Sequence, residues 1–151
     1  MSSNSTVRGS TDSPRVSVIM AVRGPAPWLQ EALESIANQT IESWELRVGV
    51  DGHDPDVIQA LEEFGSKVRW EVLPTGSGAS ACRNVALAGA QGPYSAVIDS
   101  DDTWHKNHLS QHLDAFERSG SLVLRGTRAS LMNERSQVVG TVKVPSRFLA
   151  P

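Results

Sequence analysis

Three carboxylates stand within four residues directly after a short apolar run. The run covers residues 95–98, and the carboxylates are Asp99, Asp101 and Asp102. Such a run is typical of a buried strand. Ligands of open α/β sheets bind at the carboxyl ends of strands, and clustered carboxylates repel one another unless a cation compensates them. We therefore expect a divalent metal ion with a diphosphate here, because Mg²⁺-like ions take one or two protein carboxylates and fill their other positions with phosphate oxygens and water.

Two alternatives compete with this interpretation. Asp102 or Thr103 could N-cap a helix that begins near His105, although capping needs only one side chain. The string Asp99-Ser-Asp-Asp-Thr103 also fits the DxDxT nucleophile motif of haloacid dehalogenase-like phosphatases. Those enzymes need a Lys and an acidic pair well downstream, and the 48 residues from 104 to 151 contain no such pair. The phosphatase interpretation is therefore disfavoured.

Asp51 is a second acid at the end of an expected strand, and Gly52 follows it. In a doubly wound sheet, acids at the ends of neighbouring strands can face one crevice. One of them then meets a base or ribose and the other a metal. The alternative for Asp51 is a loop aspartate that forms an Asx turn with Gly52.

A glycine-rich turn precedes the carboxylate cluster. Gly76-Ser-Gly-Ala-Ser-Ala81 fits GxGxxA, the loose dinucleotide-binding fingerprint, but it follows the third expected strand instead of the first. A Rossmann dinucleotide-binding protein is therefore a less favoured alternative. In either case the glycines allow another backbone segment or a phosphate to come close to the turn. Arg83 lies one turn inside the following helix and could donate to phosphate through its forked guanidinium. The alternative for Arg83 is a solvated helix arginine.

Three histidines, His105, His108 and His112, have spacing that could place them on one helix face. Three imidazoles on one face invite a metal hypothesis. No acidic or cysteine ligand is interleaved at metal spacing, and the neighbouring residues are polar. We therefore expect surface residues and no metal site on this helix.

The elements that must position these residues follow the order β-α-β-α-β-α-β-α, with two extended segments after them. The expected strands are 16–22, 44–50, 68–73 and 95–98, the expected helices are 28–38, 55–64, 79–90 and 105–118, and the extended segments are 122–132 and 137–144. This order predicts an α/β fold with a mostly parallel, Rossmann-like sheet and helices on both faces.

Size and composition narrow the class of protein. The chain has 151 residues, 39% of them hydrophobic and 21% charged, which suits a globular domain. Residues 1–15 have too little apolar surface to order, so we expect a disordered tail and one domain over residues 16–151. The net charge of −3, with scattered Lys and Arg, disfavours nucleic-acid binding. A single cysteine, Cys82, and no apolar run long enough for a membrane span or a signal peptide lead us to expect a cytoplasmic protein.

Two long strings now point to a family. They are VSVIMAVRGPAPWLQEALESIANQTIESWELRVGVDG and ACRNVALAGAQGPYSAVIDSDDTWHKNHL. They contain a Ser-Ile-x-x-Gln-like helix end, a strand ending in Asp, an Arg-Asn pair on a helix and an Asp-x-Asp-Asp strand end. In this order the motifs resemble the nucleotide-sugar-binding half of the family 2 glycosyltransferases of GT-A fold. The resemblance covers about residues 16–113.

The resemblance implies a role for four residues. Asp51 would contact the uracil or other base, Arg83 the nucleotide, Asp99 the ribose, and Asp101 a divalent Mn²⁺ or Mg²⁺ that holds the diphosphate. The donor would be a nucleotide-diphosphate sugar, with UDP the expected nucleotide, and the reaction an inverting transfer to an unknown acceptor. Two positions depart from the family pattern: Val50 precedes Asp51 where the family has a second Asp, and Arg23-Gly24 replaces an aromatic-Asn pair.

The family also places an acidic catalytic base and acceptor-binding residues well downstream of the DxD motif. The sequence ends before such a segment, so we expect an incomplete domain and assign no catalytic residue. The alternative to an enzyme is a non-catalytic nucleotide-binding remnant, or a module that another chain completes. Association with a membrane surface or a partner chain stays open.

Overall fold

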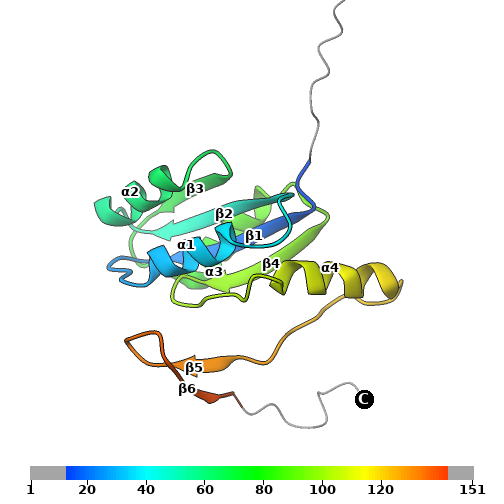
Figure 1. Cartoon of the computed structure of the whole chain (residues 1–151). Coiled ribbons are helices and arrows are strands. Elements are labelled where there is room, and N and C mark those ends of the chain that lie inside the picture. The colour runs from blue at the N-terminus through cyan, green and yellow to red at the C-terminus, as the bar shows by residue number, and fades with distance from the viewer. Residues whose placement is uncertain (1–12, 143–151) are drawn as a thin grey trace, which may run out of the picture. The chain divides into compact units, whose positions relative to one another are not determined.

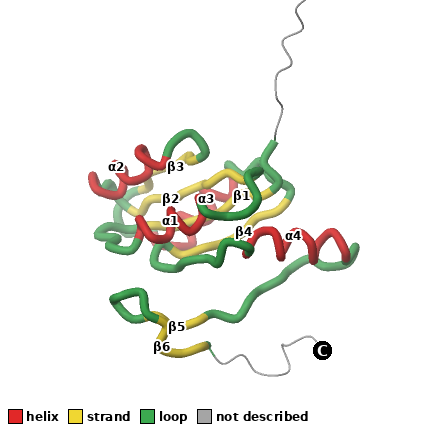
Figure 2. Tube along the Cα trace, viewed as in Figure 1, coloured by secondary structure: helices red, strands yellow, loops and turns green. Residues whose placement is uncertain are grey.

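The computed structural model describes residues 13–142 and divides into two compact units, one ending at Leu113 and one beginning at Asp114. The elements of the first unit are β1 (Val16–Val22), α1 (Leu29–Ala37), β2 (Trp44–Asp51), α2 (Pro55–Phe64), β3 (Val68–Leu73), α3 (Gly78–Ala88) and β4 (Tyr94–Asp99). Helix α4 (His108–Arg118) follows, and then β5 (Ser130–Met132) and β6 (Val138–Thr141). Figures 1 and 2 show these elements. Their order is the one that the sequence predicts.

The four strands of the first unit form one parallel sheet in the order β3-β2-β1-β4. In the register, Val16 of β1 is beside Trp44 of β2 and beside Tyr94 of β4. Strand β1 is central and its run of β-branched residues is almost wholly buried, as expected for a strand covered on both faces. Because all four strands are parallel, their carboxyl ends meet at one edge of the sheet.

Helices cover both faces of the sheet (Figure 1). On one face, alternate residues of β1 and β2 such as Val18 and Val48 pack into a core with buried residues of α1 and α2, among them Leu33 and Leu61. On the other face α3 lies so close to β2 that a Cβ at Gly49 would overlap the backbone of Cys82. These findings confirm the α/β fold with a parallel sheet.

Strand β4 differs from the expected buried strand. Its burial alternates along the strand: Ile98 is buried, whereas Val97 is 59% exposed. The cause is its place at the edge of the four-stranded sheet, since α3 packs on the other strands. The short apolar run predicts a buried strand, and for β4 this prediction was wrong except at Ile98.

The connection from β4 to α4 is tied to the end of α1. The side chain of Gln39 donates to the backbone oxygen of His105 at 3.0 Å and accepts from the N–H of Leu109 at 3.0 Å. The hydroxyl of Ser35 accepts from the N–H of Trp104 at 3.1 Å. Helix α4 begins at His108, three residues later than predicted, because these bonds hold residues 104–107 outside the helix.

The second unit contains one antiparallel hairpin, in which Ser130 pairs with Thr141. Its turn is held by the side-chain oxygen of Asn133, which accepts from the N–H groups of Arg135 and Gln137 at 3.0 Å each. The strands are shorter than the extended segments predicted at 122–132 and 137–144, and residues 143 and 144 lie outside the described residues.

Two further expectations concern the whole chain. The disordered tail at residues 1–15 falls mostly outside the described residues, and a single domain over residues 16–151 stays a prediction. Within residues 13–142, no helix is long and apolar enough to cross a membrane.

Candidate functional site

A cleft of about 360 Å³ lies at the carboxyl ends of β1, β2 and β4, beside the first turn of α3. All four predicted site residues line it: Asp51, Arg83, Asp99 and Asp101. They come from different elements and are brought together because the strands are parallel. Arg23 and Ser100 also line the cleft, with backbone and small side chains of β1 and α3 between them.

Asp51 holds the start of α3 in place. Its Oδ1 accepts from the N–H groups of Gly76 at 2.7 Å and Ser77 at 2.9 Å, and its Oδ2 accepts from the N–H of Gly78 at 3.2 Å. Gly76 and Gly78 have φ of 88° and 82°, a region that favours glycine. The glycine-rich turn is thus shaped to present its amides to Asp51, and the alternative of an Asx turn with Gly52 is not what the hydrogen bonds show.

Asp51 is ionised in this setting. Burial acts to raise its pKa, since the residue is only 7% exposed. The three backbone N–H donors and the positive charge of Arg23 outweigh burial and hold the pKa below its ordinary value. The cleft therefore has a fixed negative charge at the end of β2, surrounded by backbone donors.

Arg83 and Asp99 form an ion pair across the cleft, in which Nη2 of Arg83 donates to Oδ1 of Asp99. Both side chains keep access to solvent, at 35% and 51% exposure. The Nε of Arg83 is buried and has no hydrogen-bond partner among the described residues. A buried donor without an acceptor is costly, so a ligand oxygen placed beside it would remove that cost.

The remaining two carboxylates follow β4 directly. Asp101 lines the cleft, and the N–H of Asp102 donates to the backbone oxygen of Asp99 at 3.2 Å. Burial, then the charges of Asp101 and Asp99, raise the pKa of Asp102. Residues 13–142 contain no group of three metal-ligating side chains. Two carboxylates of this segment, Asp99 and Asp101, line the cleft, and such donors fit an ion that takes one or two carboxylates and completes its shell with ligand oxygens.

Arg23 is the residue that sequence analysis left without a role. It appeared only as a departure from the family pattern, although it lines the cleft and acts electrostatically on Asp51. Cys82 also lines the cleft and is buried; burial and the charge of Asp51 raise the pKa of its thiol, consistent with a packed, protonated cysteine.

None of the three histidines lines the cleft. His108 stacks on Trp104 with ring centroids 4.4 Å apart and lies 4.5 Å from the ring of His112. Both of these histidines are half-buried, so they are less exposed than expected. The described residues contain no metal-ligating group that includes them.

Comparison with known sequences gives one family. The model of Glycosyl transferase family 2 matches residues 17–141. One relative is the putative teichuronic acid biosynthesis glycosyltransferase TuaG of Bacillus subtilis (strain 168). It is 33% identical to this chain over 118 residues, which are 75% of this chain and 46% of TuaG. The Escherichia coli UDP-Glc:alpha-D-GlcNAc-diphosphoundecaprenol beta-1,3-glucosyltransferase WfgD is 28% identical over 141 residues, covering 93% of this chain and 53% of WfgD. The chain thus spans about half the length of these relatives.

Solved structures share the fold. S. aureus TarS 1-349 in complex with UDP-GlcNAc superimposes with a TM-score of 0.64 and 25% identity, over 80% of this chain and 38% of TarS 1-349. The mannosyltransferase PcManGT of Pyrobaculum calidifontis, in complex with GDP-Man and Mn²⁺, has a TM-score of 0.59 and 21% identity, over 69% of this chain and 32% of PcManGT. The match over residues 17–141, the relatives and the shared sheet together show that this chain belongs to glycosyl transferase family 2 and has the GT-A fold.

Proposed function

We propose that the cleft binds a nucleotide-diphosphate sugar through a divalent metal ion, for inverting transfer of the sugar to an acceptor. The observation that carries the proposal is the convergence of Asp51, Arg83, Asp99 and Asp101 on one cleft at the carboxyl edge of the sheet. The relatives support the donor class, since WfgD is named for UDP-Glc and TarS was solved with UDP-GlcNAc. A UDP-sugar is therefore the proposed donor.

Each site residue has a role in this proposal. Asp101 holds Mn²⁺ or Mg²⁺, which when bound would neutralise charge on the leaving diphosphate. Arg83 donates to a phosphate oxygen from its buried Nε, while its ion pair with Asp99 fixes the orientation of both groups. Asp99 accepts from the ribose hydroxyls. Asp51 lies next to the base, and its bonds to residues 76–78 set the shape of that end of the cleft.

Transfer also requires a base. The acceptor hydroxyl attacks the anomeric carbon, the bond from that carbon to the diphosphate breaks, and the hydroxyl proton passes to a carboxylate. Each acid that lines the cleft is already engaged, because Asp51 is bonded to three amides, Asp99 is paired with Arg83, and Asp101 is the proposed metal ligand. No described residue is therefore assigned as the catalytic base.

This shortage of a free acid favours a second candidate function. The chain could bind a nucleotide diphosphate without transferring sugar, as a module that another chain completes. The two candidates share the donor cleft and differ in acceptor-dependent release of nucleoside diphosphate from a sugar donor. For both candidate functions we propose a cytoplasmic location. Association of the chain with a membrane surface or with a partner chain is also part of the proposal.

Calorimetry with uridine diphosphate and Mn²⁺ tests the proposal. Asp101→Asn keeps the shape of the side chain and removes a charged ligand, so we expect at least about a tenfold loss of metal-dependent affinity. Asp114→Asn makes the same charge change outside the cleft and should bind like the parent chain. Unchanged affinity in Asp101→Asn would reject the metal assignment.

A further inference from the structure

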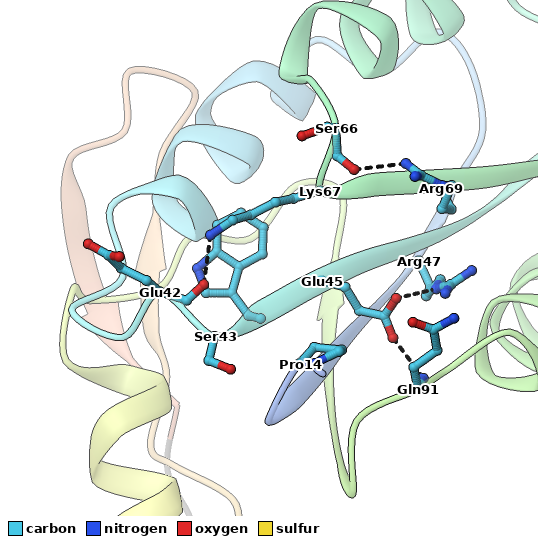
Figure 3. A pocket seen from close by; sticks show the side chains of 10 residues that line it. Pro14, Glu42, Ser43, Glu45, Arg47, Ser66, Lys67, Arg69 and Gln91 are labelled. Carbon is cyan, nitrogen blue, oxygen red and sulfur yellow. Dashed lines mark hydrogen bonds and ion pairs between the residues drawn. The ribbon is translucent and has the colours of Figure 1, made fainter. Parts of the chain in front are cut away.

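A second pocket, of about 500 Å³, lies at the amino ends of β2 and β3 (Figure 3). Three basic residues, Arg47, Lys67 and Arg69, line it together with two acids, Glu42 and Glu45. The carboxylate of Glu42 points away from the two arginines (Figure 3). Because the strands are parallel, this pocket and the donor cleft are at opposite ends of the sheet, roughly 20 Å apart along β2 at 3.3 Å per residue. Its volume is within the range of small-molecule sites, about 300–1,000 Å³.

Arg47 and Arg69 are register partners on neighbouring strands. Residues in register point to the same face of a sheet, and like charges directly opposite each other destabilise the pairing. A sheet with two arginines in this arrangement gains stability from negative charge placed near them. The protein itself supplies only part of that negative charge.

Glu45 compensates only Arg47. Its Oε2 accepts from the Nε of Arg47 at 2.7 Å, and its Oε1 accepts from the Ser17 hydroxyl and the Gln91 N–H at 2.7 Å each. Although burial acts to raise the pKa of Glu45, these bonds and the charge of Arg47 lower it, so the carboxylate is ionised and fully bonded. Among the described residues, Arg47 is the cation that it pairs with.

The other two cations bond only to neutral groups. Nη1 of Arg69 donates to the backbone oxygens of Ser66 at 2.8 Å and Val68 at 2.7 Å. Nζ of Lys67 donates to the backbone oxygen of Glu42 at 2.6 Å and lies 4.5 Å from the centre of the Trp44 ring. Among the described residues, neither has a carboxylate partner.

We propose that this pocket binds a phosphate group, carried by a small organic phosphate or by a lipid headgroup. Two uncompensated cations match the double negative charge of a phosphate monoester, and the planar fork of Arg69 can donate to two phosphate oxygens at once. Arg47, held by Glu45, supplies further positive potential from the neighbouring strand. The pocket is larger than a phosphate ion and leaves room for the attached organic group.

The test is a titration of the full chain with glycerol 3-phosphate, followed by amide NMR. EDTA is present, so that metal-dependent binding in the donor cleft does not contribute. We expect saturable shifts at residues 66–69 and Gln91 and none at residues 76–78. Arg69→Gln should weaken binding about tenfold, as the loss of one charge-assisted contact predicts. Arg128→Gln changes an exposed arginine that does not line the pocket, so it is the matched control and should bind within about twofold of the parent.

Two results would overturn the proposal: no saturable shift at residues 66–69 in the parent chain, or equal weakening in Arg69→Gln and Arg128→Gln. If Arg69→Gln has lost the parent's amide spectrum, Lys67→Gln takes its place and must also weaken binding. Sedimentation with vesicles that contain phosphatidic acid, a phosphate monoester, against phosphatidylcholine vesicles separates the two phosphate sources. Pelleting that Arg69→Gln loses and Arg128→Gln keeps assigns the site to a headgroup, and saturation by glycerol 3-phosphate without pelleting assigns it to a soluble phosphate.

Discussion

The two ends of β2 each carry one buried acid, and the two acids are satisfied in different ways. Asp51 at the carboxyl end accepts from three backbone amides of one turn. Glu45 at the amino end shares its oxygens among a hydroxyl, one amide and the guanidinium of Arg47. Asp51 therefore forms no hydrogen bond to an arginine, whereas Glu45 is bonded to Arg47.

The two ends of the sheet therefore differ in the charge that is left without an oppositely charged partner. At the carboxyl end, Asp99, Asp101 and Asp102 outnumber the cations bonded to them, and the pKa of Asp102 is raised by burial and by its two neighbours. At the amino end, Lys67 and Arg69 have no acidic partner among the described residues. The difference supports the two proposals, a cation with its diphosphate at the carboxyl end and an anion at the amino end.

The largest effect is expected where α3 meets β2 between the two ends. Gly49→Ala adds a Cβ that would overlap the backbone of Cys82, so either α3 or β2 must move. We expect the free energy of unfolding to fall by about 3 kcal/mol. Gly120→Ala is the control, because a Cβ there meets nothing within 4 Å. Chemical denaturation measures both, and equal stability of the two variants would contradict the close packing of α3.

A smaller effect is expected at the ion pair of the donor cleft. Arg83→Gln should lower affinity for uridine diphosphate about tenfold, because it removes a charged donor to phosphate. The same variant should change the free energy of unfolding by less than about 1 kcal/mol, since the pair with Asp99 is part exposed and screened. A large loss of stability with unchanged affinity would make Arg83 a structural residue.

The smallest effect is expected in the pH dependence of stability, to which both buried acids contribute. The pKa values of Asp51 and Glu45 are both lowered in the folded chain, so each contributes stability that is present above its unfolded pKa and is lost as pH falls through the folded value. Stability should therefore decline below about pH 4. Asp51→Asn and Glu45→Gln should each flatten that decline, which thermal unfolding across pH measures. Asp56→Asn, on the exposed first turn of α2, serves as the control and should leave the decline unchanged.

The element order could be predicted from the sequence because its signals are local. Asp54 and Pro55 mark the start of α2, and the side chain of Asp54 indeed accepts from the N–H groups of Asp56 and Val57. The four residues of the cleft could also be named, since three lie at or just after a strand end and Arg83 lies near the start of a helix. Their individual roles stay predictions.

Features that depend on pairing between distant segments could not be predicted. The bonds of Asp51 to the turn at residues 76–78 join positions about 25 residues apart, and the exposure of Val97 follows from the place of β4 in the sheet. The basic residues looked scattered along the sequence. Only the register of β2 with β3 brings Arg47 beside Arg69.

Hydrogen exchange with UDP-GlcNAc and Mn²⁺ tests most directly whether the two ends of the sheet bind different ligands. The account predicts slower amide exchange at residues 76–78 and 100–102 when donor and metal are both present, and unchanged exchange at residues 66–69. Protection at residues 66–69 instead, or no protection at residues 76–78, would contradict the assignment of the donor to the carboxyl end.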